Sequence, residues 1–201
     1  MKKVIVYIDG FNVYHAIDAL GDPKLKWLNL WSLSESLLRP DEKLVAVKYF
    51  SAFQTKRPDA YARHRSYVKA LKFSGVSVQM GNFKFKDMEC RRCHTQWKQP
   101  EEKETDVHIA ITMVSDAFLG NFERCILISA DSDLVPPKSL IKAQYPEKEF
   151  FVVAPPGRFG SARALKPNME ITKGRLKKHL FDLDIKDQSS NVVISAPREY
   201  R

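Results

Sequence analysis

The chain has 201 residues, of which 44% are hydrophobic and 28% charged, a composition typical of one soluble globular domain. Lysine and arginine number 33 against 24 acidic residues, and the net charge of +9 favours a polyanionic partner such as nucleic acid, although a basic excess can also serve solubility alone. The absence of any membrane-length apolar run or signal-peptide core, together with only three cysteines, excludes a membrane span and a disulfide-stapled fold and favours a cytoplasmic protein.

The first predicted element is a strand over residues 4–8, which ends at Asp9. Five consecutive apolar or aromatic residues, most of them β-branched, are typical of a central parallel strand that is buried on both faces. Ligands of open α/β sheets bind beyond the carboxyl ends of the strands, which is where Asp9 stands. Gly10 allows the chain to turn there, and Asn12 offers a side-chain amide, unless Asp9 and Asn12 only cap the helix that follows.

Helical and strand patterns alternate along the rest of the chain. The expected helices span residues 13–20, 30–38, 58–73, 105–120, 136–145 and 176–181. The expected strands span residues 43–53, 76–80, 125–128 and 150–154. The alternation predicts a single-domain α/β fold with a mostly parallel central sheet and helices on both faces. We expect the domain to cover residues 1–183 and residues 184–201 to form a frayed tail, in which residues 192–194 are a candidate edge strand.

A basic, cysteine-containing insertion loop is expected at about residues 82–103, where no clear periodicity is visible. Its cations alternate with aromatic residues, an arrangement typical of single-stranded nucleic-acid grooves. The expected nucleic-acid-binding residues are Lys84, Lys86, Arg91, Arg92 and Lys98 in this loop, and Arg158 and Arg163 after the last strand. The alternative is a solvated loop with its aromatic rings packed underneath.

Cys90 and Cys93 have the spacing of half a structural zinc site, and a complete site needs two more ligands. The adjacent His94 is badly placed to reach the same ion, so His108 or a partner chain would have to contribute. A free thiol pair and a redox switch stay open as alternatives. Cys125 lies within a predicted strand and is expected to be buried and inert.

Four carboxylates are expected to converge at the carboxyl end of the sheet. Asp9 follows the first strand, and Asp131 and Asp133 follow the strand at 125–128. Asp106 lies in the first turn of the helix that leads into that strand, and such a helix runs antiparallel to the strand, so its first turn lies at the same edge. A hard cation with oxygen ligands commonly neutralises crowded carboxylates, so we expect Mg²⁺ or Mn²⁺, although each acid alone can also serve as a helix cap.

Three runs of the sequence together resemble the NYN domain family. They are Val-Tyr-Ile-Asp-Gly-Phe-Asn at residues 6–12, Lys-Glu-Thr-Asp-Val at 103–107, and Ile-Ser-Ala-Asp-Ser-Asp-Leu at 128–134. The runs occur in the family's order, and the resemblance covers residues 3–155. The family includes the LabA-like proteins and belongs to the PIN-like nuclease group, so the resemblance implies a PIN-like fold.

The resemblance also implies roles for single residues. The catalytic and metal-binding acids would be Asp9, Asp106, Asp131 and Asp133, with Asn12 beside the metal or the scissile phosphate and Ser129 as a supporting hydroxyl residue. Ala130 and Thr105 are departures, because the family commonly has glycine at both positions. The substitution at Ala130 affects the turn beside the site.

The activity that the resemblance implies is that of a divalent-metal-dependent ribonuclease, an endonuclease that hydrolyses RNA phosphodiester bonds. The alternative is a catalytically silent RNA-binding or regulatory module on the same fold. A phosphatase of the haloacid dehalogenase type is excluded, because that chemistry needs a second aspartate two residues after Asp9, where Phe11 stands. The sequence leaves open whether the protein forms a homodimer.

Overall fold

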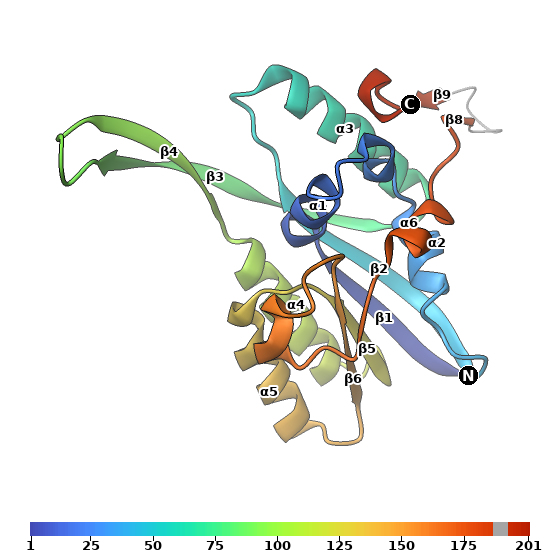
Figure 1. Ribbon diagram of the computed structural model, residues 1–201. Helices are drawn as coiled ribbons and strands as arrows, with labels where there is room; N and C mark the ends of the chain where they lie inside the picture. The colour runs from blue at the N-terminus through green and yellow to red at the C-terminus, as the bar shows by residue number, and fades with distance from the viewer. Residues whose placement is uncertain (187–192) are drawn as a thin grey trace.

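A seven-stranded sheet organises the computed structural model, which describes residues 1–186 and 193–201 except for the side chains of residues 99–101 (Figure 1). The strand order is β4-β3-β2-β1-β5-β6-β7, and β1 therefore lies at the centre. Every pairing is parallel except that of β3 with β4. The strands are β1 (Lys2–Asp9), β2 (Glu42–Ala52), β3 (Ser77–Glu89), β4 (Gln96–Lys103), β5 (Arg124–Ile128), β6 (Glu149–Ala154) and β7 (Met169–Glu170).

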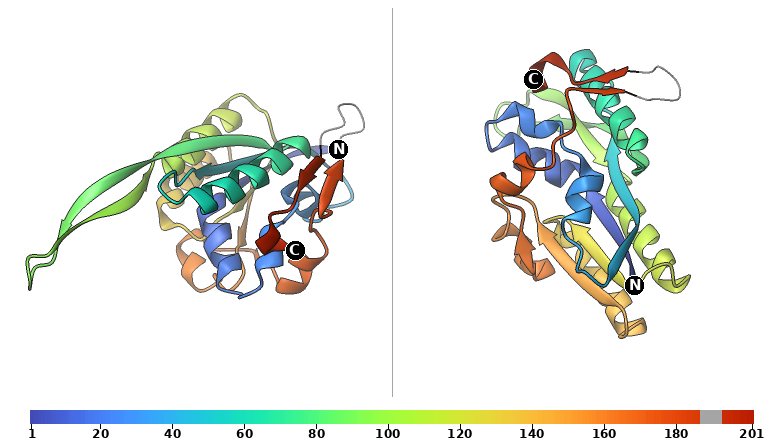
Figure 2. Two further views of the ribbon diagram at one scale, coloured as in Figure 1. Left: turned by 90° about the horizontal axis from the view of Figure 1, so that it is seen from above. Right: turned by 90° about the vertical axis from the view of Figure 1, so that its right-hand side faces the viewer.

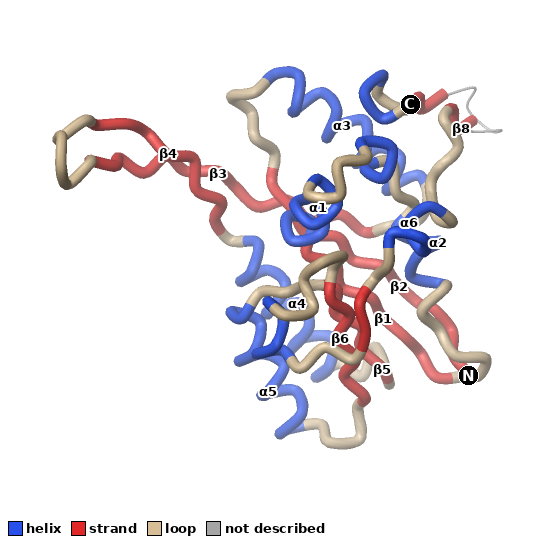
Figure 3. Tube along the Cα trace, in the orientation of Figure 1, coloured by secondary structure: helices blue, strands red, loops and turns tan. Residues whose placement is uncertain are grey.

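Helices cover both faces of the sheet, as the sequence predicts (Figure 3). The α-helices are α1 (Gly10–Asp18), α2 (Leu30–Glu35), α3 (Pro58–Phe73), α4 (Thr105–Phe118), α5 (Val135–Gln144) and α6 (Lys173–Lys177). Four 3₁₀ turns complete the set: η1 (Pro23–Lys26), η2 (Ser132–Leu134), η3 (Ser161–Leu165) and η4 (Arg198–Tyr200). Within the described part of the chain, no helix is both long and apolar enough to cross a lipid bilayer.

Strand β1 separates two hydrophobic cores, because alternate side chains of a strand point to opposite faces. Val4, Val6 and Ile8 pack into the core that α1, α2, α3 and α6 cover. Ile5 and Tyr7 pack into the core under α4 and α5. All five side chains are buried, which confirms the expected central strand with two covered faces and fixes Asp9 at its carboxyl end.

A buried ion-pair network joins the starts of three strands at the opposite edge of the sheet. Arg124, which is almost fully buried, donates to Oε2 of the buried Glu42 at 2.7 Å. Its Nε also lies 3.4 Å from Oε1 of Glu149, and Arg39 in turn pairs with Glu149. The network therefore ties β2, β5 and β6 together at the end of the sheet that carries no candidate site residue.

Replacing Glu42 with alanine is expected to lower the free energy of unfolding by about 3 kcal/mol, because it leaves the buried Arg124 guanidinium with an incomplete set of partners. Urea unfolding followed by circular dichroism measures this change. The double variant Glu42→Met with Arg124→Met should recover most of the loss, since no buried charge remains. A single-variant loss under about 0.5 kcal/mol would contradict the role of the pair.

The prediction of a loop without regular structure at residues 82–103 is wrong. This segment forms most of a long antiparallel hairpin of β3 and β4 that extends away from the body of the domain (Figures 1 and 2). Phe83 and Phe85 alternate with Lys84 and Lys86, which is a strand pattern. This alternation is short and lies among polar residues, so it did not stand out in the sequence. The residues are polar because most of the hairpin covers no hydrophobic core. Pro100 is tolerated, since β4 is an edge strand.

The described C-terminal residues, 184–186 and 193–201, form regular structure where a frayed tail was expected. Val193–Ser195 forms β9, which pairs with β8 (Asp184–Lys186) in a separate small sheet. Ala196 and Tyr200 are buried against Trp27 and Ala70, so apolar packing holds the end of the chain on the domain. The candidate edge strand at 192–194 does not join the main sheet, and Val192 lies outside the described residues. The last expected helix occurs earlier, as α6.

Candidate metal centre

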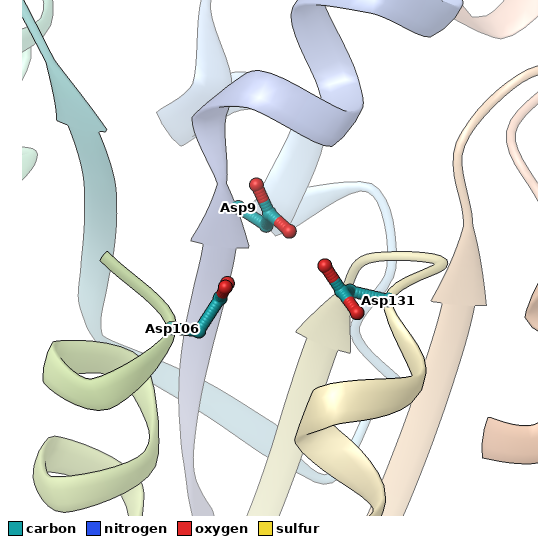
Figure 4. Close-up of side chains that lie close together, drawn as sticks. All are labelled: Asp9, Asp106 and Asp131. Carbon is teal, nitrogen blue, oxygen red and sulfur yellow. The ribbon is translucent and has the colours of Figure 1, made fainter. Parts of the chain in front are cut away.

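Three aspartate carboxylates converge at the carboxyl edge of the central strands (Figure 4). Asp9 ends β1, Asp131 follows the neighbouring β5, and Asp106 lies in the first turn of α4. Each offers one carboxylate oxygen, and these oxygens all lie within 4.8 Å of one another. The parallel pairing of β1 with β5 and the packing of α4 on β1 produce this arrangement.

Asp9 is the most constrained of the three, with only 2% of its surface exposed. Its Oδ2 accepts hydrogen bonds from Asn12 Nδ2 at 2.6 Å and from Ser129 Oγ at 2.8 Å, and its Oδ1 accepts the Asn12 backbone N–H at 3.0 Å. The Asn12 Oδ1 atom in turn accepts the Ala130 N–H at 3.3 Å. Asn12 and Ser129 therefore fix the orientation of the Asp9 carboxylate, and Asp9 also caps α1.

Crowding of negative charge changes the acidity of the cluster. Burial, followed by the charges of Asp9, Asp131 and Asp133, raises the pKa of Asp106 from its ordinary value of 3.8 to about 6. Burial also raises the pKa of Asp9, against its hydrogen bonds with Asn12 and Ser129. The ion pairs identified among the described residues join other acids to their basic partners.

Glu102 is an acidic neighbour that the sequence analysis missed. Burial, followed by the charges of Asp9, Asp106 and Asp131, raises its pKa to about 8, so its carboxyl is largely protonated at neutral pH. Its Oε1 atom is buried and has no hydrogen-bond partner among the described residues. Glu102 pairs with Phe83 in the hairpin register, so only a correct prediction of β4 could have placed it beside the cluster.

The cluster has the chemistry of a divalent-cation site. Three oxygen donors lie within reach of one ion, they belong to buried or half-buried carboxylates, and no soft ligand is among them. Hard cations such as Mg²⁺ and Mn²⁺ prefer such donors. Asp9, Asp106 and Asp131 are therefore the residues that would hold the metal.

Protons and metal are expected to compete for this site. Between about pH 4 and pH 6 the folded state binds more protons than the unfolded state, because the pKa of Asp106 is raised, so in chelator this group lowers stability as pH rises through that window. The same deprotonation frees the ligand, so the stabilisation by Mn²⁺ should be small at pH 5 and large at pH 7.5. Thermal unfolding with Mn²⁺ and with chelator measures both trends. Equal Mn²⁺ stabilisation at the two pH values would contradict this account.

Asp133, the fourth predicted acid, lies outside the group of three. It is exposed, and its N–H donates to Asp131 Oδ1 at 2.9 Å, so it belongs to the turn that orients Asp131. Ser129 Oγ accepts the Asp131 N–H at 3.0 Å and thus links the two strand ends. Ala130 needs no left-handed backbone, which explains why alanine is tolerated where the family commonly has glycine.

The predicted nucleic-acid-binding residues lie in two places. Arg163 is exposed on η3, which packs against η2 beside Asp131, and the half-buried Arg158 lies in the loop before η3. The other five lie on the protruding hairpin: Lys84 and Lys86 on β3, Lys98 on β4, and Arg91 and Arg92 in the turn at its tip. Only Lys98 has an acidic neighbour among the ion pairs described, Asp87 at 3.8 Å. The hairpin is therefore a basic arm that starts at the candidate site.

Cys90 and Cys93 lie at the turn of this hairpin. Hydrogen bonds from Thr95 and then from Cys90 lower the pKa of the exposed Cys93 thiol to about 7. His94 Nδ1 lies 2.6 Å from Glu89 Oε1, and His108 belongs to α4. Among the described residues only the three aspartates form a group of three or more metal ligands, so zinc at the cysteine pair stays a prediction that needs ligands from elsewhere. Cys125 is buried in β5, as expected.

A pocket of about 550 Å³ lies close to the carboxylates, although none of the three aspartates lines it. Glu102 of β4, whose pKa is raised in part by the charges of all three aspartates, lines the pocket, as do Gly10 and Phe11, which follow Asp9 directly. The remaining wall comes from the rest of α1, from η1, β2, the segment before α3, α3, β3 and η4, and it is rich in aromatic rings. The sequence analysis did not predict this pocket, because residues from both ends of the chain and from its middle meet only in the folded structure.

A mostly parallel α/β sheet with three aspartates at the carboxyl edge of its central strands defines the class of the protein, an α/β domain with an acidic candidate metal site. Residues 3–167 match the NYN domain. The chain therefore belongs to the NYN domain family, whose fold is that of the PIN-like nucleases.

Among the proteins that are similar to the chain are a monooxygenase of Pseudomonas putida and a protein of Vibrio parahaemolyticus. The 6-hydroxy-3-succinoylpyridine 3-monooxygenase HspA of Pseudomonas putida (strain DSM 28022 / S16) is 24% identical over 194 residues, which cover 78% of this chain and 61% of that protein. The chain thus spans about three fifths of the length of this relative. The crystal structure of VPA0982 from Vibrio parahaemolyticus RIMD 2210633, a protein of unknown function, superposes with a TM-score of 0.57 at 19% identity. The superposition covers 90% of this chain and 96% of that one, and it supports the fold alone.

Proposed function

We propose that the protein is a divalent-metal-dependent ribonuclease that cuts within RNA strands. The observation that carries this proposal is the cluster of Asp9, Asp106 and Asp131 at the carboxyl edge of an NYN fold. The net charge of +9 and the basic hairpin favour a polyanionic substrate. The proposal extends the nuclease character of the family to a particular site and substrate.

The side chains at the site have two roles: some would bind the metal, and others orient the metal-binding carboxylates. Asp9, Asp106 and Asp131 would hold Mg²⁺ or Mn²⁺, which when bound supplies Lewis-acid stabilisation of charge on the phosphoryl group and lowers the pKa of a bound water. Asn12 and Ser129 keep the Asp9 carboxylate aimed at the cluster. Glu102, largely protonated at neutral pH, adds no full charge to it. Arg163 on η3 is the nearby cation that can position a phosphate.

The hairpin is proposed to guide the RNA strand toward this centre. Replacing Arg91 and Arg92 together with alanine should weaken RNA binding and reduce the slope of log affinity against log salt by about 1.4, the value for two lost contacts with single-stranded phosphates. Fluorescence anisotropy across a potassium chloride series, in chelator, measures the slope.

The matched control is Lys177→Ala with Lys178→Ala, which removes the same charge from two exposed residues at the end of α6. This variant should keep the slope within experimental error of the wild type. Equal slope changes in both double variants would mean that only net charge matters and that the hairpin has no special role.

The proposed function is tested by incubating a labelled RNA of mixed structure with Mn²⁺, with Mg²⁺ and with chelator. Metal-dependent fragments with internal cut positions are expected. Tight RNA binding without cleavage under either ion would favour the catalytically silent binding module instead.

The relative HspA provides a second candidate function, oxygenation of a small hydroxypyridine. The specific observation in its favour is the pocket beside the carboxylates, whose aromatic lining suits a planar ring. Consumption of oxygen that depends on 6-hydroxy-3-succinoylpyridine and an added two-electron reductant tests it. The ribonuclease proposal predicts no such consumption.

A further inference from the structure

The pocket beside the carboxylates is walled largely by aromatic rings, and some of these rings contact one another. Phe11 and Phe83 meet edge to face at 5.7 Å, and Phe11 stacks on His15 at 6.2 Å. Tyr14, Tyr49 and Tyr67 add further rings. A volume of about 550 Å³ lies within the range of small-molecule sites, so one planar heteroaromatic ring and part of a sugar can enter.

The wall also carries polar groups that can read the edge of such a ring. His64 is half-buried in the wall, and desolvation lowers its pKa to about 4, so its imidazole is neutral at pH 7 and offers one donor and one acceptor. Its Nε2 lies 3.4 Å from the Tyr49 hydroxyl. Gln54 and Ser51 lie in the same wall, and Glu102 brings a buried Oε1 atom without a partner among the described residues. A purely apolar ligand would leave these groups unpaired.

Cations stand around the pocket, and one of them is available for a phosphate. Lys26 pairs with Asp18, and Arg63 pairs with Glu199 at 2.9 Å. Arg57 is exposed and makes no ion pair within residues 1–186 and 193–201 as the structure describes them. The Arg63–Glu199 pair and the ring of Tyr200 show that the C-terminal segment completes the wall.

We propose that this pocket receives one nucleobase of the bound RNA, turned out of the strand next to the phosphodiester bond that faces the three aspartates. The assignment rests on the proposed ribonuclease function. The pocket lies close to the cluster because Glu102, which lines it, is near enough to feel the charges of all three aspartates, and because Gly10 and Phe11 of its wall directly follow Asp9. Stacking on the rings supplies affinity for any base, and His64, Gln54 and Ser51 supply preference among bases. Arg57 contacts a phosphate of the same strand.

The first experiment measures binding of the four ribonucleoside 5′-monophosphates to the full chain in chelator, so that neither metal nor cleavage is involved. His64→Leu should weaken the preferred nucleotide about tenfold, and Arg57→Ala should weaken it about threefold or more while leaving the parent nucleoside unchanged. Arg65→Ala, an exposed arginine of α3 that does not line the pocket, is the matched control. Binding that is absent, or unchanged in both pocket variants, overturns the proposal. Should His64→Leu fail to fold, Arg57→Ala decides alone.

The second experiment places one abasic residue at each position of a short RNA and maps cleavage in Mn²⁺. Loss of cutting next to the abasic position supports the proposal that a base turned out of the strand enters the pocket. Equal cutting at all positions overturns this proposal. The two failures are distinguishable: cleavage without any nucleotide binding removes the pocket assignment only, whereas nucleotide binding that depends on His64 without cleavage removes the ribonuclease proposal only. Binding of free nucleotides with uniform cutting would make the pocket a site for a free ligand and contradict a base of the strand.

Discussion

Asp131→Asn is expected to lower the rate of RNA cleavage at saturating Mn²⁺ by about a hundredfold or more, with the thermal unfolding midpoint in chelator unchanged or slightly raised. The amide has the shape of the carboxylate, and its oxygen can still accept the Asp133 N–H that Asp131 Oδ1 accepts at 2.9 Å. What is lost is one of three negative charges that would bind the metal, worth several kcal/mol in the transition state. Burial and then the charges of Asp9 and Asp131 raise the pKa of Asp106, so removing the Asp131 charge relieves part of this effect.

Two further substitutions of aspartate by asparagine make this prediction specific. Asp133→Asn changes the neighbouring acid, which lies outside the three-carboxylate group, and should cost less activity than Asp131→Asn. Asp41→Asn changes an exposed acid at the opposite edge of the sheet and should cost none. Single-turnover rates compare all three variants. An equal loss of cleavage rate in Asp131→Asn and Asp133→Asn would contradict the prediction, because it would mean that the charge of the whole turn matters and not that of the three-carboxylate cluster.

Gly10→Ala is expected to destabilise the fold by about 1–3 kcal/mol and to reduce cleavage further than the loss of folded protein explains. A Cβ at this buried position would lie 2.6 Å from the Phe50 carbonyl oxygen and 2.6 Å from Tyr49 Cζ. The carbonyl belongs to the backbone of β2, so the junction of β1 and α1 must move away from β2. This displacement moves Asp9 and Asn12, the residues on either side of the turn.

The control for this substitution is Gly160→Ala, where an added Cβ meets no atom within 4 Å beyond its chain neighbours. Urea unfolding should give a change near zero for this variant and a clear loss for Gly10→Ala. If both variants keep the wild-type stability and rate, the close approach of Gly10 to β2 does not constrain the site.

The sequence was sufficient where one local pattern decided the outcome. The apolar run of β1 predicted a central strand, and the alternation of strands with helices predicted a mostly parallel sheet with both faces covered. Asp9 and Asp131 could be brought together from sequence because parallel neighbours end at the same edge. Asp106 followed from the direction of the helix before β5.

What the sequence did not reveal depends on contacts between distant segments. The hairpin of β3 and β4 leaves the domain, so its strands lack the buried face that makes a strand pattern easy to recognise. Because the register of the hairpin was not predicted, the sequence could not show that Glu102 lies near Asp9. Tyr200 reaches the pocket wall only because the chain end packs on Trp27, and no short pattern encodes that contact.

The most direct test of the central claim compares wild type and Asp131→Asn, purified side by side, on one labelled RNA in Mn²⁺ and in chelator, with the ends of the products identified. In-line hydrolysis with a leaving 3′ oxygen predicts fragments that carry 5′-phosphate and 3′-hydroxyl ends, formed by the wild type in Mn²⁺ alone. Cutting that persists in chelator, that is equal in the variant, or that leaves 2′,3′-cyclic phosphates would contradict a metal-dependent ribonuclease at the three aspartates.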